Sequence, residues 1–186
     1  MEKFKIVFLD IDGVICTENS LHRAVADWSG LDENDPYLLF KYNKIRKEIG
    51  FFPNFNMENW PFDRNALKNI HELSREKNVR FVISSTWRIG RTADQLKKLF
   101  TMKGMCLPII DRTPANNPDL DGRGEEIQFW LNKASNDKQF GVESYVVIDD
   151  DCYDIELLHP NNFVRTNFKD GFNDAALKLA KEILNR

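Results

Sequence analysis

The segment Phe8-Leu9-Asp10-Ile11-Asp12-Gly13-Val14 decides the fold, because it joins an apolar run to two acidic residues spaced two apart. The run itself, residues 4–10, is short, apolar and β-branched, which is typical of a strand buried on both faces of a sheet. Such strands belong to parallel sheets whose two faces are covered by helices. The segment therefore predicts an α/β protein whose first strand ends in carboxylates.

The rest of the chain supports this prediction, since apolar runs alternate with segments of helical spacing. We expect further strands at residues 79–83, 105–110, 145–148 and 163–166, and helices at residues 63–77, 92–103, 124–134 and 175–184. Alternating strands and helices indicate βαβ units and a parallel sheet. The expected fold is a Rossmann-like, doubly wound parallel sheet.

Residues 15–62 do not fit this alternation. The stretch has helical patches at residues 21–28 and 37–49, and then becomes aromatic and irregular without a strong buried strand. The aromatic residues are Phe51, Phe52, Phe55 and Trp60, which favour a small core of the insertion over a ligand platform. We therefore expect a core domain of residues 1–14 and 63–186 and a small, mostly helical cap inserted between them.

Composition limits the classes of function. The 186 residues include 26 Lys and Arg against 29 Asp and Glu, a formal net charge of −3, which argues against nucleic-acid binding through bulk positive charge. The cysteines Cys16, Cys106 and Cys152 form no CxxC pair, which favours a reducing compartment. No apolar run approaches the about 20 residues of a membrane helix. We expect a cytoplasmic protein with no membrane association and no obligate protein partner.

Oxygen-bearing side chains follow three of the expected strands. Asp10 and Asp12 follow the first strand, Ser84-Ser85-Thr86 follow the strand at residues 79–83, and Asp149-Asp150 follow a later one. Ligands of open parallel sheets bind just beyond the carboxyl ends of the strands. We therefore expect these residues, which are distant in sequence, to meet in one crevice.

The acidic residues of this crevice predict a metal site. Carboxylates packed together raise one another's pKa, and a divalent cation would relieve their repulsion. Oxygen ligands without a nearby His or Cys point to Mg²⁺ rather than Zn²⁺, and Mg²⁺ is usually completed by waters and a substrate phosphate. The expected metal residues are Asp10, Asp12, Asp149 and Asp150.

The segment at residues 8–14 resembles the nucleophile motif of the haloacid dehalogenase-like hydrolases, the HAD superfamily, in which DxDGT or DxDGV follows an apolar strand. The other family motifs can be matched in order. Ser84-Ser85-Thr86 resembles the Ser/Thr motif, Arg123 in Gly122-Arg123-Gly124 the basic motif, and Asp149-Asp150 the acidic motif in its DD form. The matches span nearly the whole chain, so the resemblance implies the HAD fold.

A narrower resemblance is carried by three segments: Ser85-Thr86-Trp87-Arg88, Arg123-Gly124-Glu125-Glu126-Ile127 with Trp130-Leu131, and Val146–Asp150. These segments look like a compact HAD branch associated with RNA-repair proteins. The resemblance implies a phosphorylated nucleic-acid end as one candidate substrate.

The resemblance also implies roles for the two acidic residues of the first motif. Asp10 would attack phosphorus and form an aspartyl-phosphate. Asp12 would protonate the leaving oxygen and then activate the hydrolytic water, while its backbone carbonyl would be a metal ligand. Asp149 would bind the metal through its carboxylate, and Asp150 would bind a metal water or orient the site.

The remaining catalytic roles concern the phosphoryl oxygens. Ser85 would bind them, helped by backbone N–H groups near Gly13 and Thr86, and Arg123 would stabilise their charge. Ser84 could replace Ser85, because a strand end is predicted only to within a residue or so. The family carries Lys more often than Arg at the basic position. Lys133 and Lys138 are therefore alternatives to Arg123, although Arg is always charged and offers a fork of donors.

Other features bear on the substrate. Trp87 and Arg88 could stack on a base and clamp a second phosphate; alternatively, the Trp packs under a loop and the Arg lies on the surface. A basic face on the insertion could guide a polyanion or could simply be solvated. Its residues are Lys41, Lys44, Arg46 and Lys47. We expect a phosphorylated nucleotide or nucleic-acid end to be preferred over a sugar phosphate.

The function that these expectations favour is a Mg²⁺-dependent phosphatase that hydrolyses a phosphomonoester. One alternative is a phosphotransferase or phosphomutase of the same fold, which would hand the phosphoryl group to another hydroxyl. The other is a catalytically silent HAD fold that serves as a binding module, and the presence of a residue at every catalytic position argues against it.

Overall fold

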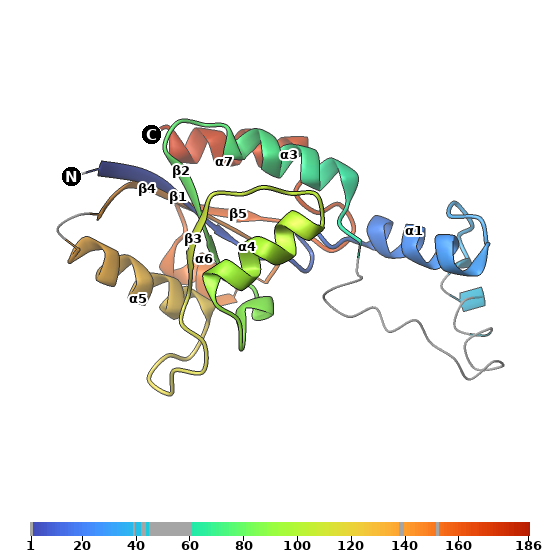
Figure 1. Ribbon diagram of the computed structural model, residues 1–186, viewed down its shortest axis with the longest axis horizontal. Helices are drawn as coiled ribbons and strands as arrows, with labels where there is room; N and C mark the ends of the chain where they lie inside the picture. The colour runs from blue at the N-terminus through green and yellow to red at the C-terminus, as the bar shows by residue number, and fades with distance from the viewer. Residues whose placement is uncertain (1, 39, 42–43, 45–60, 138–139, 152) are drawn as a thin grey trace.

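The centre of the protein is a five-stranded, wholly parallel sheet in the order β3-β2-β1-β4-β5 (Figure 1). The computed structural model describes residues 2–38, 40–41, 44, 61–137, 140–151 and 153–186. The strands are β1 (Glu2–Leu9), β2 (Val79–Ile83), β3 (Ile109–Arg112), β4 (Phe140–Asp149) and β5 (Phe163–Arg165). Because β1 pairs with β2 on one side and β4 on the other, the three strands with polar carboxyl ends are neighbours.

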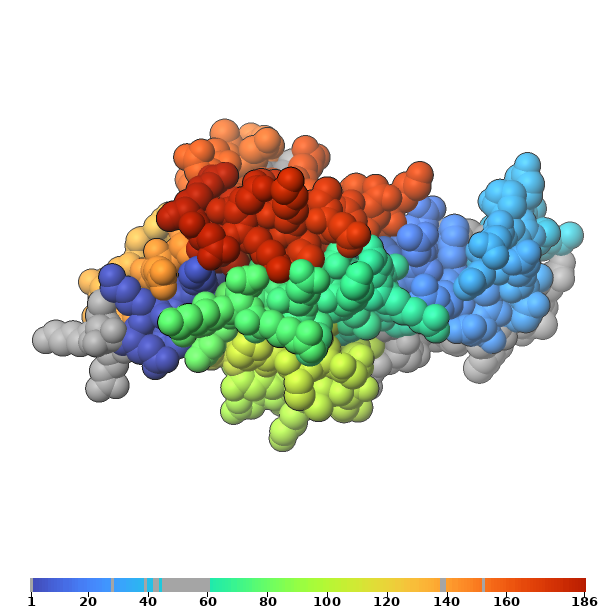
Figure 2. All heavy atoms as spheres, turned by 90° about the horizontal axis from the view of Figure 1, so that it is seen from above, coloured from blue at the N-terminus to red at the C-terminus, as the bar shows by residue number. Residues whose placement is uncertain are grey.

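Helices cover both faces of this sheet, as predicted for a doubly wound fold. One face carries α3 (Arg64–Ser74), α4 (Ala93–Met102) and α7 (Asp174–Leu184), and the other carries α5 (Arg123–Ser135) and α6 (Tyr153–Leu158). Figure 2 shows α3 and α7 side by side on their face. Alternate side chains of β1 serve the two cores: Val7 and Leu9 pack toward α3, α4 and α7, and Ile6 and Phe8 toward α5 and α6.

The third strand differs from the prediction. The apolar pattern indicated residues 105–110, whereas β3 runs from Ile109 to Arg112. Pro108 has no N–H to donate, so only its carbonyl joins the pairing, by accepting from the N–H of Phe81 at 3.0 Å. The strand then continues into the polar Asp111, whose Oδ2 accepts from the indole N–H of Trp130 at 2.8 Å.

The inserted segment leaves and rejoins the core at one point. The N–H of Asp63 donates to the carbonyl of Ile15 at 2.7 Å, and the hydroxyl of Thr17 donates to Asp63 Oδ2 at 3.2 Å. Ile15, Cys16 and Phe62 pack in the core beneath α3 and α4. The first helix, α1 (Glu18–Ser29), therefore begins outside the core, and it extends away from the sheet beyond its carboxyl edge (Figure 1).

Much of the rest of the insertion lies outside the described residues, including Arg46, Lys47, Phe51, Phe52, Phe55 and Trp60. In the described part, Val25 and Ala26 of α1 pack with Leu38 in a small separate cluster. Lys41 forms an ion pair with Asp35. Among the described helices, none is long and apolar enough to cross a membrane.

Candidate active site

Three carboxylates meet at the carboxyl edge of the sheet. Asp10 follows β1, Asp149 ends β4, and Asp150 comes next in the chain; one oxygen from each lies within 4.8 Å of the others. The N–H of Asp10 donates to the carbonyl of Ile148 at 3.0 Å, which ties the ends of the two strands together. Asp10 and Asp149 are almost completely buried. The pairing of β1 with β4 thus brings acids together that are far apart in sequence.

Arg123 is the basic residue of this cluster. It is the first residue of α5, and its Nη1 lies 3.1 Å from Asp10 Oδ1 and 2.7 Å from Asp149 Oδ2. Burial alone would lower the pKa of the Arg123 guanidinium, but Asp10 and Asp149 outweigh it and raise the pKa. Lys133 lines a different cavity, beside Trp130, and Lys138 lies outside the described residues. The structure therefore places Arg123 at the site.

The electrostatics of the cluster suit a divalent cation. Burial and the neighbouring Asp149 raise the pKa of Asp10 to about 7, against the lowering effect of Arg123. Burial also raises the pKa of Asp149, to about 6, again opposed by Arg123. A single guanidinium thus leaves the carboxylates partly uncompensated. All donors are oxygens, with no His or Cys among them, so the residues present fit Mg²⁺.

The carboxylate of Asp12 stands outside this cluster. Its Oδ2 accepts a hydrogen bond from the indole Nε1–H of Trp87 at 3.0 Å. Burial raises the pKa of Asp12 above its usual value, and the bond from Trp87 opposes that rise. The side chain that would exchange a proton with substrate is thereby held apart from the three grouped carboxylates.

Gly13 makes room for the acidic cluster. It has a φ of +70°, and a Cβ there would collide with the carboxylate of Asp150. Its N–H donates to the carbonyl of Cys16 at 2.8 Å. The N–H of Gly13 itself is therefore already paired, and the glycine contributes space. The expectation that backbone N–H groups near Gly13 bind phosphoryl oxygens stays a prediction.

The two serines after β2 differ in their surroundings, although both are buried. A hydrogen bond from Ser85 lowers the pKa of Asp10, so its hydroxyl lies against that carboxylate. Ser85 Oγ also accepts from the N–H of Trp87 at 3.4 Å, at the start of the 3₁₀ turn η1 (Thr86–Arg88). The hydroxyl of Ser84 has no hydrogen-bond partner in the described part of the chain. The geometry thus favours Ser85 over Ser84 as the serine that would contact phosphoryl oxygens. Thr86 is the next residue in the chain.

Trp87 does not offer a stacking surface. Its side chain is 3% exposed and packs against Phe62, with the ring centroids 6.1 Å apart. Its polar edge is taken up by Asp12. The expectation that it would stack on a base is wrong, because the ring is buried against Phe62 at the end of the insertion.

Arg88 is buried as well, at 4% exposure, and neither prediction made for it was correct. Its guanidinium donates to backbone carbonyls of Ser84, Ser85, Thr113 and Pro114 at 2.6–3.3 Å, and it forms an ion pair with Glu126. It therefore neither clamps a second phosphate nor lies on the surface. Instead, it ties the end of β2 to the loop after β3 and to α5.

Replacing Arg88 by Ala should lower the free energy of unfolding by about 3 kcal/mol, because Glu126 and several buried carbonyls would lose their partner. Urea denaturation of the variant and of the wild type measures this. The exposed Lys98→Ala on α4 is the matched control and should change stability little. Equal stability of Arg88→Ala and wild type would contradict the tying role.

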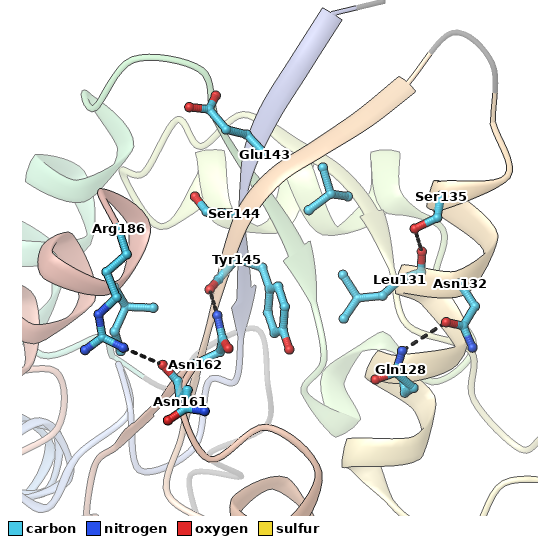
Figure 3. Close-up of a pocket in the computed structure, with 12 residues that line it drawn as sticks. Gln128, Leu131, Asn132, Ser135, Glu143, Ser144, Tyr145, Asn161, Asn162 and Arg186 are labelled. Atoms are coloured by element: carbon cyan, nitrogen blue, oxygen red, sulfur yellow. Dashed lines mark hydrogen bonds between the residues drawn. The ribbon is translucent and has the colours of Figure 1, made fainter.

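A groove of about 430 Å³ opens beside the cluster, between the loops that follow β2, β3 and β4. The rim carries the ring of Tyr153, which is 82% exposed, and Ile89. Sequence reasoning missed Tyr153 because an exposed aromatic residue has no periodic pattern. A second cavity, of about 570 Å³, lies between α5, β4 and the C-terminal residues and is lined by amides such as Gln128 and Asn162 (Figure 3). Arg123, which contacts Asp10 and Asp149, lines the groove but not this second cavity, so the groove is the space that belongs to the site.

The parallel sheet, the acidic strand ends and the basic helix start together define a domain of the HAD superfamily. The sequence matches, over residues 6–177, the family described as the HAD domain in Swiss Army Knife RNA repair proteins, and the chain belongs to this family. The comparison with curated proteins gives no match.

Solved structures of two other proteins are similar to this chain. The HAD domain of the effector protein Lem4 from Legionella pneumophila is 20% identical, with a TM-score of 0.50 over 99% of this chain and 95% of that one. An inactive mutant of the same domain is 18% identical, with a TM-score of 0.51 over 99% of this chain and 94% of that one. A haloacid dehalogenase-like hydrolase from Streptococcus pneumoniae is 13% identical, with a TM-score of 0.43 over 96% of this chain and 91% of that one. At 18–20% identity the likeness to the Lem4 domain concerns the fold alone.

Proposed function

We propose that this protein is a Mg²⁺-dependent phosphatase that hydrolyses phosphomonoesters with Asp10 as the nucleophile. The observation that carries the proposal is the meeting of Asp10, Asp149 and Asp150 with Arg123 at the carboxyl edge of a HAD-type sheet. Ligands of such sheets bind at this edge. Membership of a HAD family supports a hydrolase in general, and the arrangement of the four side chains supports phosphoryl transfer in particular.

The metal would be held by the carboxylates of Asp10, Asp149 and Asp150 and by the backbone carbonyl of Asp12. Bound there, Mg²⁺ would neutralise charge on the phosphoryl group. Arg123 would share that task, since its guanidinium already contacts Asp10 and Asp149. Ser85 would orient the phosphoryl oxygens by hydrogen bonding.

The reaction proceeds in two steps, phosphorylation of Asp10 and hydrolysis of the aspartyl-phosphate. A carboxylate oxygen of Asp10 forms a bond to phosphorus while the bond from phosphorus to the leaving oxygen breaks, and Asp12 gives that oxygen its proton. Asp12 then takes a proton from water, which attacks phosphorus and breaks the bond to Asp10. Phosphate leaves, and Asp12 is protonated again. The raised pKa of Asp12 suits a residue that must hold a proton at the start.

A phosphate-release screen in the presence of Mg²⁺ tests this function. It should cover aryl phosphates, sugar phosphates, nucleoside monophosphates and oligonucleotides with 3′- or 5′-phosphates. Release of free phosphate as the main product supports a phosphatase. Transfer of the phosphoryl group to an added alcohol instead would indicate a phosphotransferase, and no turnover of any compound would indicate a silent binding module.

For the substrate class we propose a phosphorylated nucleotide, in keeping with a family that is named for RNA repair. Because Trp87 is buried, Tyr153 on the groove rim takes over the expected stacking role. The groove also contains Asp121, Asp151 and Asp154, whose negative charge disfavours a polyanion. A nucleoside monophosphate therefore suits the groove better than the charged backbone of an oligonucleotide.

Tyr153→Ala should lower kcat/KM for a nucleoside monophosphate about tenfold, because stacking of a base on an aromatic ring contributes about 1–3 kcal/mol. The rate for a small alkyl phosphate, which has no ring, should stay nearly unchanged. Leu157→Ala is the matched control and should leave both rates unchanged, because Leu157 is an exposed apolar residue of the same helix, with 71% of its surface accessible. An equal fall for both substrates would show that Tyr153 does not bind a base.

We also propose that residues 15–62 form a cap for the crevice at the carboxyl edge of the sheet. The neck between Ile15 and Asp63 supports this, because it attaches the insertion directly beside the strand end that carries Asp10.

A further inference from the structure

The backbone next to Arg123 is held on both sides, by Asp154 of α6 and by His159, the first residue after α6. The N–H of Gly124 donates to Asp154 Oδ2 at 2.5 Å. The carbonyl of Gly124 lies 2.9 Å from Nε2 of His159, which must be the donor because a carbonyl only accepts. Both polar groups of the residue after Arg123 are thus bound to residues of one short segment.

His159 is itself fixed in place. Its side chain is 1% exposed, and its Nδ1 lies 3.0 Å from the hydroxyl of Tyr145 on β4. The two ring nitrogens therefore each have a partner, one in α5 and one in the sheet. A ring held at both nitrogens and buried has little freedom to turn, so it links α5 firmly to β4.

The glycines on either side of Arg123 are explained by the same contact. A Cβ on Gly122 would collide with the carboxylate of Asp154, and a Cβ on Gly124 would lie 2.9 Å from the carbonyl oxygen of Asp154. Gly122 supplies no side-chain cap to α5. Asp154 takes that place, where a negative charge near the N-terminus of a helix is favourable. The Gly122-Arg123-Gly124 sequence thus fits the close approach of Asp154.

We propose that Asp154, supported by His159, is a positioning residue that sets the backbone of Arg123 so that its guanidinium contacts both Asp10 and Asp149. The inference rests on the proposed function, in which Arg123 stabilises the phosphoryl charge. Asp154 does not belong to the three grouped carboxylates, and it acts through the backbone of Gly124. Displacement of a charged group by about 1 Å can cost about a hundredfold in rate, so such a contact matters for catalysis.

Asp154→Ala should lower kcat for an aryl phosphate about tenfold and change KM little. Asp154→Asn keeps an oxygen that can accept from the N–H of Gly124, so it should restore most of the rate. Glu156→Ala, an exposed acidic residue of the same helix, is the matched control and should behave as wild type. In an Arg123→Ala background, Asp154→Ala should have no further effect, because the residue it positions is gone.

A second measurement is independent of activity. The Nε–H signal of Arg123 in NMR spectra should be sharp in the wild type and in Glu156→Ala, and broadened in Asp154→Ala. The amide of Gly124 should lose its protection from hydrogen exchange in the same variant. Circular dichroism and thermal unfolding show whether each variant is folded.

The outcomes separate the two proposals. If the wild type releases no phosphate, the proposed function fails, and the Arg123 signal still decides whether Asp154 positions it. An unchanged Arg123 signal in folded Asp154→Ala would overturn the inference. So would a loss of rate that persists in full in the Arg123→Ala background, or an Asp154→Asn variant as slow as Asp154→Ala.

Discussion

Asp10→Asn is expected to reduce phosphate release by about 10⁴-fold or more, which is the scale of loss when a catalytic nucleophile is removed. An amide is a far poorer nucleophile than a carboxylate and cannot form the aspartyl-phosphate. The exchange is nearly isosteric, and it removes one of the charges that burial and Asp149 make unfavourable. The variant should therefore remain folded, so the loss can be assigned to the chemistry.

The measurement is phosphate release from an aryl phosphate with Mg²⁺, alongside thermal unfolding of the same samples. Asp94→Asn, at an exposed position on α4, makes the same chemical change far from the cluster and should keep wild-type activity. A wild-type rate in Asp10→Asn would end the covalent mechanism.

Asp12→Asn should slow the hydrolysis of an unactivated alkyl phosphate about 10²–10⁴-fold, the usual contribution of general acid–base catalysis. Trp87 donates to this side chain, so an Asn would turn its oxygen toward the indole and would have no proton to exchange with the leaving group. An aryl phosphate with a good leaving group needs less protonation. Its first step should therefore suffer less.

The phosphorylated form of Asp10 should then accumulate, because the second step also needs Asp12. Rates for the two substrates and the mass of the intact protein after an acid quench measure this. Equal losses for both substrates, with no phosphorylated protein, would remove Asp12 from the proton transfers.

The sequence was sufficient to predict the sheet, because buried parallel strands carry a strong local signal. The strand at residues 79–83 is found as predicted, and β1 ends beside Asp10. The limits of β3 could not be predicted in the same way. An apolar run does not show where pairing begins, and here Pro108 delays it.

The candidate site was predictable where it follows strand ends and, through the family resemblance, at Arg123. The fate of Trp87 and Arg88 depends on Phe62, Glu126 and Thr113, which approach them only in the folded chain. No local pattern contains that information. The structure was therefore needed to show that Arg123 lies at the acidic cluster, whereas Arg88 is buried and binds backbone carbonyls.

The helix α6 was missed for a related reason. Within it only Ile155 is buried, so a six-residue segment shows no helical periodicity. Because α6 was not predicted, the contacts of Asp154 and His159 with Gly124 could not be predicted either. The short helix matters because it fixes the start of α5, and the start of α5 carries Arg123.

The central claim is that the three carboxylates work with a divalent cation, and removal of the metal tests it most directly. Phosphate release from an aryl phosphate should fall to the level without enzyme in excess EDTA and return when Mg²⁺ is added beyond the chelator. The same samples should remain folded by circular dichroism throughout. Full activity in EDTA would contradict the account.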